Sequence, residues 1–368
     1  MRLLALYVFF KTVADVSYTE LRHREKAGWY VALSAAESLL LLGFVLLFLV
    51  GWREGIAGVM KGYVASSAAV AVGASILLVR SVAWRPSWAL VRPMLVFGLP
   101  LIVSGLAGRF LYFGDRFVIV QIAGLEANAT YELAAQFGTL VFTFLVQGVQ
   151  MSFTVVGMKV VGDAAAAALY RRSFRHFAAV AGFGALGIGL FASAAARLVA
   201  TDAAYLTIDA PAFLVAAGFG FNGLYGIAVS ALYAASKTRA VALGVGAAAV
   251  LNLVLNLALV PLIGITGSAL ATLVAYAALA VWAGQAAAPL VGTRLPWGGV
   301  AGVALATGAL WALGQLADAS QVGGFALRAG VLTLYPAALV GLGVYGRADA
   351  QAALALVRRR LGGARRGA

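Results

Sequence analysis

Apolar stretches long enough to cross a lipid bilayer follow one another along almost the whole of this 368-residue chain. A hydrocarbon core about 30 Å thick needs roughly 20 apolar residues per helix. Hydrophobic residues make up 63% of the sequence, and charged residues make up 11%, compared with about a quarter in soluble domains. A soluble fold of this length could not bury so much apolar surface, so the chain is expected to lie in a membrane.

The apolar stretches are continuous, whereas the strands of a membrane β-barrel alternate apolar and polar residues. Within lipid, a helix is the other structure that satisfies its own backbone hydrogen bonds. The sequence therefore predicts an all-α, polytopic integral membrane bundle of about eleven transmembrane helices. The predicted spans are residues 3–20, 29–51, 55–79, 94–122, 129–155, 176–196, 210–234, 240–262, 265–289, 297–316 and 325–346.

The loops between these spans alternate in charge. Lys and Arg gather in every second loop and in the tail after residue 346, whereas the intervening loops are neutral or acidic. This is the positive-inside pattern, and it predicts a cytoplasmic carboxyl terminus. With an odd number of spans, Met1 would then lie on the outer side. The basic loops are residues 21–28, 80–93, 156–175, 235–239 and 290–296.

The chain is strongly basic, with 27 Lys and Arg against 13 Asp and Glu. Because the excess sits in short loops, it indicates contact with anionic lipid and argues against a nucleic-acid partner. Cysteine is absent, and the two histidines, His23 and His176, lie in predicted basic loops, so no metal and no cofactor are expected. We find no Ser/His/Asp arrangement, Gly-rich phosphate loop or carboxylate cluster, and therefore expect no catalytic residues and no enzyme activity.

Two segments of the chain are similar to each other. Residues 55–72 read GIAGVMKGYVASSAAVAV, and residues 264–281 read GITGSALATLVAYAALAV. Each segment opens a predicted span. Transporters are often built from duplicated helical lobes, so the repeat favours a transporter.

Three stretches carry a resemblance to a known family. Residues 97–124 (FGLPLIVSGLAGRFLYFGDRFVIVQIAG) contain the Asp115–Arg116 pair, and residues 130–141 (TYELAAQFGTLV) follow them. The third stretch, residues 231–276, contains Asn252, Asn256, Pro261 and the run Gly-Ile-Thr-Gly. In these motifs the chain resembles the polysaccharide transporter family of the MOP superfamily, which contains the Wzx-like flippases of lipid-linked oligosaccharides.

The resemblance implies a MOP-type fold of two lobes with a V-shaped cavity between them. Residues 1–79 would form a partial N-terminal lobe of three helices, and residues 94–289 would form the C-terminal six-helix lobe. Two peripheral helices at 297–346, with a groove for a lipid tail, would precede a basic cytoplasmic tail at 347–368. About three N-terminal helices of the family pattern are not present in this sequence. A start codon further upstream, gene decay and a short protein are the open explanations.

The resemblance also implies a function. The protein would be a flippase of the bacterial inner membrane that translocates an undecaprenyl-pyrophosphate-linked oligosaccharide for polysaccharide biosynthesis, such as that of O-antigen lipopolysaccharide, capsule or exopolysaccharide. Its partners would be this lipid-linked oligosaccharide, membrane lipids, a polysaccharide polymerase and glycosyltransferases. Three alternatives stay open: a lipid II flippase, a cation-coupled multidrug antiporter of the same superfamily, and an inactive truncated remnant.

Basic side chains inside the predicted spans are candidates for binding the pyrophosphate of the substrate. An ionisable group at the centre of a span costs roughly 2.5–3.5 kcal/mol on insertion, so it usually faces a cavity or a partner. Arg109 and Arg116 are seven residues apart on one helix face, and Arg binds phosphate oxygens in a bidentate manner. Asp115 would offset part of their charge, and Lys61 and Lys11 are further candidates. A structural Arg–Asp pair near the membrane surface is the alternative.

Two carboxylates, Asp15 and Glu37, are candidates for coupling transport to a proton or sodium gradient, because burial favours the neutral form of such a group. A structural hydrogen bond is the alternative role for Glu37. Asp15 lies four residues after Lys11, so these two side chains could instead neutralise each other. Uncharged polar side chains could line a path for the sugars, and hydrogen bonding between helices is the alternative role for the asparagine pair among them. These residues are Gln136, Gln147, Asn222, Asn252 and Asn256.

Overall fold

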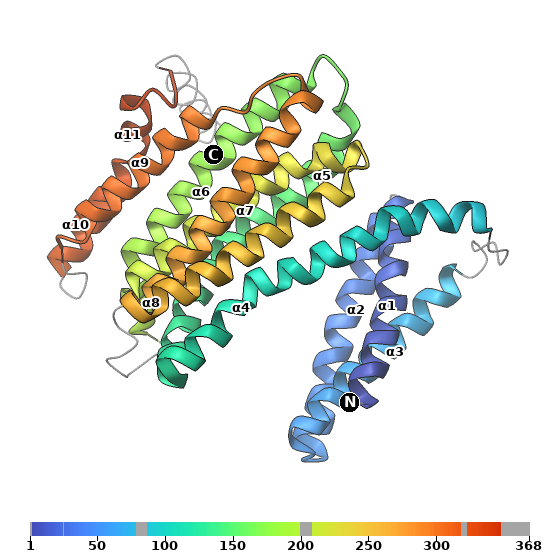
Figure 1. Ribbon diagram of the computed structural model, residues 1–368. Coiled ribbons are helices and arrows are strands. Elements are labelled where there is room, and N and C mark those ends of the chain that lie inside the picture. The colour runs from blue at the N-terminus through green and yellow to red at the C-terminus, as the bar shows by residue number, and fades with distance from the viewer. Residues whose placement is uncertain (1, 25, 79–86, 199–207, 318–321, 347–368) are drawn as a thin grey trace, which may run out of the picture. The chain divides into compact units, whose positions relative to one another are not determined.

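The structure, a computed structural model, describes residues 2–24, 26–78, 87–198, 208–317 and 322–346. All regular elements in these ranges are helices, so the predicted all-α class is confirmed (Figure 1). Eight of the described helices are long and apolar enough to cross a membrane, and two of these are continuous over the length of two spans. The predicted basic tail, residues 347–368, and the first half of the predicted loop 80–93, residues 80–86, lie outside the described residues.

The chain divides into two compact units, Met1–Val91 and Arg92–Ala368. In the first unit, α1 (Arg2–His23) and α2 (Ala27–Leu46) both pack against α3 (Gly55–Leu78), and the π-helical turn η1 (Leu47–Gly51) extends α2. Small residues permit this close packing, because a Cβ on Gly62 would lie 2.7 Å from Cγ2 of Val45. The core of the unit is formed by Ala14, Tyr18, Val70 and Ala71.

Two long helices of the second unit, α4 (Trp88–Val141) and α8 (Thr238–Val291), each contain a break. In α4 the break is Gly124, with φ 89° and ψ 175°. In α8 it is Ile263 and Gly264, and Gly264 has φ 58° and ψ −141°. Glycine adopts a positive φ without steric cost, which is why it occupies both positions. Each long helix is thus two consecutive helices, as the separate predicted spans require.

The break in α8 gives a testable prediction. Replacing Gly264 by Ala is expected to lower the free energy of unfolding by about 1–3 kcal/mol, because a side chain is strained at this φ. Gly246→Ala is the matched control, since Gly246 lies in the regular part of α8 and a Cβ there would meet no atom within 4 Å. The control is expected to stabilise the helix by up to about 1 kcal/mol. Thermal unfolding in detergent measures both, and equal effects would contradict the prediction.

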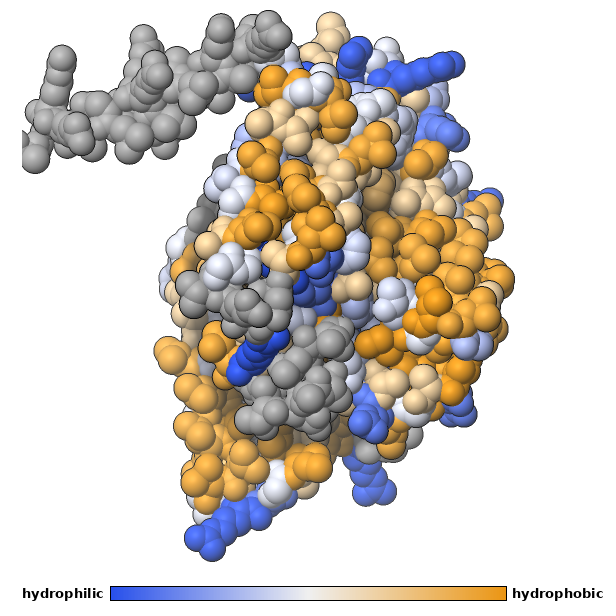
Figure 2. All heavy atoms as spheres, turned by 90° about the vertical axis from the view of Figure 1, so that its left-hand side faces the viewer, coloured by the Kyte–Doolittle hydropathy of each residue, from blue (hydrophilic) through white to orange (hydrophobic). Residues whose placement is uncertain are grey.

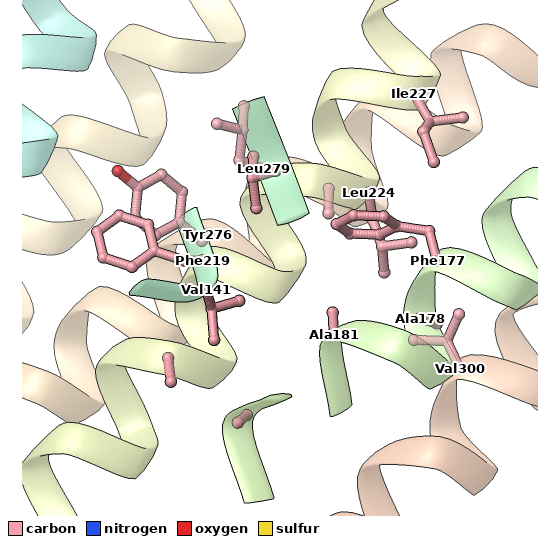
Figure 3. Close-up of a cluster of buried hydrophobic side chains, with 14 of the residues drawn as sticks. Val141, Phe177, Ala178, Ala181, Phe219, Leu224, Ile227, Tyr276, Leu279 and Val300 are labelled. Atoms are coloured by element: carbon pink, nitrogen blue, oxygen red, sulfur yellow. The ribbon is translucent and has the colours of Figure 1, made fainter. Parts of the chain in front are cut away.

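The remaining helices of the second unit surround α7 (Asp209–Ala234), most of whose residues are buried. It packs against α8, against α6 (Ala166–Ala196), and against α5 (Gln147–Val160), which the π-helical turn η3 (Phe142–Val146) joins to α4. Figure 3 shows side chains of the shared core pointing toward one another from these helices. They include Phe177 and Ala181 of α6, Phe219 and Leu224 of α7, and Tyr276 and Leu279 of α8.

The helices α9 (Trp297–Gly314), α10 (Val322–Thr333) and α11 (Tyr335–Gly341) complete the second unit, and α9 packs along α6. Figure 2 shows the face on which they lie: hydrophobic side chains cover large parts of it, and hydrophilic ones lie at its upper and lower edges and near its centre. Large apolar side chains such as Phe144, Leu243 and Leu305 are also exposed on the second unit. Such a surface is expected of a protein surrounded by lipid.

One buried ion pair fastens α10 to the rest of the second unit. Nη1 of Arg328 lies 2.8 Å from Oδ2 of Asp209 and donates a 2.6 Å hydrogen bond to the carbonyl of Leu190, while its Nε donates to the carbonyl of Ala317 at 3.0 Å. The Arg328 residue is 6% exposed. Asp209 also accepts a hydrogen bond from the backbone N–H of Ser193, so one carboxylate connects α6, α7 and α10.

The predicted loop 156–175 is wrong in extent. Helix α5 continues to Val160 and α6 begins at Ala166, so Arg171, Arg172 and Arg175 lie on α6. Charged residues at the end of a helix interrupt an apolar stretch without breaking the helix, because the backbone hydrogen bonds are made within the helix itself. The apolar pattern therefore marked the apolar part of α6 and missed its first ten residues, 166–175.

Candidate functional site

A buried charged cluster lies where the two halves of α4 fold against each other. Asp115, on the first half, is 2% exposed. Its Oδ1 accepts hydrogen bonds of 2.9 Å from both the backbone N–H and Nη1 of Arg116, and its Oδ2 accepts one from the hydroxyl of Tyr131 on the second half. The break at Gly124 makes this arrangement possible, because it reverses the chain between Asp115 and Tyr131.

Arg116 is fully engaged within this cluster. Its Nε donates to Oε2 of Glu132 at 2.7 Å, and its Nη1 also donates to the carbonyl of Tyr112 at 2.7 Å. The guanidinium carbon lies 5.1 Å from the ring centroid of Phe113, within the range of a cation–π contact. Two carboxylates face one guanidinium, so the cluster carries a formal charge of −1 and Arg116 is held as a structural cation.

A ladder of uncharged polar side chains lies across the break in α8. The hydroxyl of Ser268 donates to Oδ1 of Asn256 at 2.6 Å, and Nδ2 of Asn256 donates to the carbonyl of Asn252 at 2.9 Å. Nδ2 of Asn252 in turn donates to the hydroxyl of Thr272 at 3.3 Å. All four residues are at most 4% exposed. Their polar groups therefore satisfy one another inside the lobe, as buried polar groups in lipid require.

The charged cluster and the α8 ladder lie beside each other. Both contribute to the wall of a cavity of about 10 Å³, which is room for roughly one water molecule. Its lining includes Asp115, Tyr131, Thr139, Thr272 and Tyr276. Among the described residues there is no group of three or more His, Asp or Glu side chains that could hold a metal ion.

Arg109 differs from Arg116 in its surroundings. It lies on the first half of α4, is exposed, and makes no hydrogen bond or ion pair with any described residue. The structure therefore separates the two arginines that the sequence analysis treated together. Arg116 is bound by two carboxylates, whereas Arg109 has a guanidinium available for a ligand.

A second charged cluster lies in the first unit. Nζ of Lys11 is 2.9 Å from Oε1 of Glu37 and 3.2 Å from Oδ1 of Asp15. The hydroxyl of Tyr18 donates to Oε2 of Glu37 at 2.7 Å. The structure thus brings the predicted Lys11–Asp15 pair together and adds Glu37 to it, for a formal charge of −1. Lys61 is not part of this cluster, because its Nζ pairs with Oε1 of Glu54 at 2.7 Å.

The predicted sugar-path residues fall into two groups. Gln136 donates to Glu132 at 3.1 Å, the side chain of Asn222 accepts from Gln150 at 3.1 Å, and Gln147 is exposed. Asn252 and Asn256 are enclosed within the ladder described above, an arrangement that matches their alternative role. Contact of any of these residues with a sugar stays a prediction.

Sequence reasoning missed Tyr131, Ser268 and Thr272, because single hydroxyl residues are common in apolar helices and gave no signal of their own. It also missed Arg328, although a charge within the predicted span 325–346 was the same signal that identified Arg109.

Comparisons with known proteins agree with this architecture. Residues 1–156 match a family described as polysaccharide biosynthesis protein. No curated protein matches the chain significantly. The fold is similar to that of the lipid II flippase MurJ in an inward closed conformation, with a TM-score of 0.67 and 14% identity over 94% of this chain and 75% of that one. It is also similar to a MATE transporter of Vibrio cholerae, with a TM-score of 0.66 and 15% identity over 77% of this chain and 67% of that one.

At such low identity these similarities establish the fold, and the family match adds a sequence relationship over the first 156 residues. The resemblance that the sequence motifs indicated is confirmed at this level. In its described residues the chain is an all-α, multi-pass membrane protein whose fold is similar to those of MurJ and the MATE transporters, and residues 1–156 match the family described as polysaccharide biosynthesis protein.

Proposed function

We propose that the chain is a flippase that carries an undecaprenyl-pyrophosphate-linked oligosaccharide across the bacterial inner membrane by alternating access, with its carboxyl terminus in the cytoplasm. The observation that carries this proposal is the guanidinium of Arg109, which has no partner among the described residues and lies on a largely apolar helix segment. Arg109 lies about 22 Å along the helix from the break at Gly124, which is within a hydrocarbon core about 30 Å thick. A cation is retained at such a depth when it meets water or an anionic ligand.

The chemistry of the substrate fits this group. A pyrophosphate offers several oxygens that a planar guanidinium can bind through paired hydrogen bonds, which an ammonium group cannot reproduce. Arg116 is engaged by Asp115 and Glu132, so its role is to hold the two halves of α4 while Arg109 contacts the head group. Glycosyltransferases would supply the lipid-linked oligosaccharide, and a polymerase would consume it after translocation.

A second candidate, a lipid II flippase, is favoured by the similarity to MurJ, which extends over 94% of this chain. Reconstitution separates the two. Proteoliposomes containing the full chain and either the undecaprenyl-pyrophosphate oligosaccharide or lipid II are probed with a membrane-impermeant lectin specific for the sugar. If the oligosaccharide reaches the far leaflet faster than lipid II does, the result supports the proposal. If lipid II alone is transported, the protein is a lipid II flippase instead. Transport of neither substrate would indicate an inactive protein.

The cluster of Lys11, Asp15 and Glu37 is the proposed coupling site, because two carboxylates face one ammonium group and leave an excess negative charge that can attract the coupling cation. Replacing Glu37 by Gln is expected to reduce the stimulation of flipping by a proton gradient about fivefold or more. A fivefold change corresponds to a coupling free energy of about 1 kcal/mol, at the lower end of the typical range. The amide keeps the size of the side chain, and its oxygen can still accept from Lys11 while its NH2 group donates to the hydroxyl of Tyr18, so downhill flipping should continue.

Asp15→Asn is the matched control, since the Asp15 side chain is 60% exposed and that of Glu37 is 20% exposed. Its effect on gradient-driven flipping should be smaller. Measurement in proteoliposomes with and without an imposed pH difference tests this. A Glu37→Gln protein that responds fully to the gradient would exclude the cluster as the coupling site.

A further inference from the structure

A large groove in the second unit belongs to neither of the charged clusters described above. It has a volume of about 680 Å³, within the range of about 300–1,000 Å³ that is common for ligand sites. Its walls are formed by η3 and α5 on one side and by α6 on the other, and Ile227 of α7 contributes to its base. Binding of a ligand in this groove does not depend on the proposed transport activity.

Most of the groove is apolar and open to the exterior. Phe144, Val156 and Val180 line it and are 76%, 49% and 50% exposed, whereas Phe153 and Phe177 are buried and form its base. Gly148 also lines the groove, and a Cβ added there would meet no atom within 4 Å. An exposed apolar groove of this kind on a membrane protein can accept a hydrocarbon chain.

The groove becomes polar near the first turns of α6. Arg172, Ser173 and His176 line it there, and Ser152 of α5 contributes a further hydroxyl. Arg172 is exposed and makes no ion pair or hydrogen bond with the described residues. His176 is held in place, because its Nδ1 lies 2.7 Å from the hydroxyl of Tyr345 and the two rings stack.

The surroundings of this polar end are basic. Lys159 lies in the last turn of α5, and Arg171 and Arg175 flank Arg172 on α6. Asp163, in the short connection between the two helices, is the acidic residue closest in sequence. Arg172 has no partner among the described residues, and it lies beside hydroxyl groups at the polar end of the apolar groove. This arrangement is complementary to an anionic amphiphile.

We propose that this groove binds an anionic phospholipid of the surrounding bilayer, with its phosphate at Arg172 and Ser173 and one acyl chain between α5 and α6. Basic pockets between transmembrane helices are known to hold anionic lipid head groups. One available guanidinium matches the single charge of a phosphodiester, which favours a bulk phospholipid over a pyrophosphate-linked lipid. The bound lipid would strengthen the contact of α5 with α6 along the groove.

Native mass spectrometry and thermal unfolding of the full chain in detergent test this site, with palmitoyl-oleoyl phosphatidylglycerol as the probe. Palmitoyl-oleoyl phosphatidylethanolamine, with the same chains and no net charge, is the reference lipid. Phosphatidylglycerol is expected to bind more tightly and to raise the unfolding temperature. Arg172→Gln should weaken its binding about fivefold, as expected for one basic side chain near an anionic lipid. Arg171→Gln removes the same charge from a neighbouring exposed position outside the groove and should have little effect.

A second variant tests the apolar part of the groove. Gly148→Leu places a side chain in the open space and should lower the affinity for both lipids. Gly187→Leu on α6, where a Cβ also meets no atom within 4 Å, is the control that leaves the groove open. If Arg172→Gln and Arg171→Gln lowered the affinity for phosphatidylglycerol equally, the effect would come from the general surface charge, and the proposal would be overturned. So would equal binding of the two lipids, or selective displacement of phosphatidylglycerol from this groove by a pyrophosphate-linked lipid.

Discussion

Replacing Arg109 by Ala is expected to slow flipping of the lipid-linked oligosaccharide at least about tenfold while leaving the amount of folded protein in the membrane unchanged. Arg109 has no partner among the described residues, so its removal breaks no interaction within the protein, and loss of a charge from an apolar helix favours insertion. A hydrogen bond to a charged group contributes about 1.5–3 kcal/mol, so loss of a bidentate contact should slow transport by at least about tenfold.

Surface polysaccharide in a flippase-deficient strain, normalised to protein level, measures this effect. Arg109→Lys keeps the charge and loses the planar pair of donors, so it should restore export only in part. Arg171→Ala, at an exposed position on α6, is the control for loss of a basic residue. Normal export by Arg109→Ala protein at a normal level would refute the assigned role of Arg109.

Arg116→Ala should behave differently from Arg109→Ala. It removes the cation that faces Asp115, which is 2% exposed, and leaves that carboxylate without compensation. Breaking a buried pair in this way costs about 3–5 kcal/mol, so the amount of folded protein should fall together with export. The contrast separates a residue that contacts the substrate from one that holds the lobe together.

An equally large effect on stability is expected for Arg328→Ala. This substitution leaves the carboxylate of Asp209 and the carbonyl groups of Leu190 and Ala317 without their donor, at a residue that is 6% exposed. The expected loss is about 3–5 kcal/mol in the free energy of unfolding. Helix α10 should also become accessible to protease before the rest of the second unit unfolds, because Arg328 connects it to α6 and α7.

Thermal unfolding and limited proteolysis in detergent measure these changes. Arg294→Ala is the control, since Arg294 is an exposed arginine of the same unit, and a surface substitution of this kind changes stability by about 0.5 kcal/mol or less. The double variant Arg328→Met with Asp209→Asn should recover part of the loss, because it removes both charges together. If Arg328→Ala were as stable as Arg294→Ala, the pair would not fasten α10.

The helical class and the positions of the spans could be predicted because the length of an apolar stretch is a local property that the bilayer imposes. The extent of α6 could not, since Arg171 and Arg172 interrupt the apolar stretch without ending the helix. At Gly124 the sequence predicted a loop over residues 123–128, whereas Gly124 alone departs from helical geometry. Glycine allows the reversal to occur at one residue.

The charged residues of the candidate site could be identified from their cost in lipid, but their partners could not. Lys11 and Asp15 are four residues apart on one helix, so their contact followed from helical spacing. Arg116 meets Glu132 across a break, and Arg328 meets Asp209 across 119 residues. Such pairs depend on how whole helices pack, which no local pattern encodes.

The enclosed position of α7 has a consequence for how the protein is made. In the finished molecule 72% of its membrane-spanning window is buried, so neighbouring helices and not lipid surround most of it. During synthesis α7 emerges before α8 and α9 exist, so it must enter the bilayer before these neighbouring helices can cover it. The hydrophobicity of α7 is therefore required for its insertion into the bilayer during synthesis. A polar substitution in α7 should reduce the yield of assembled protein more than the stability of the molecules that do assemble.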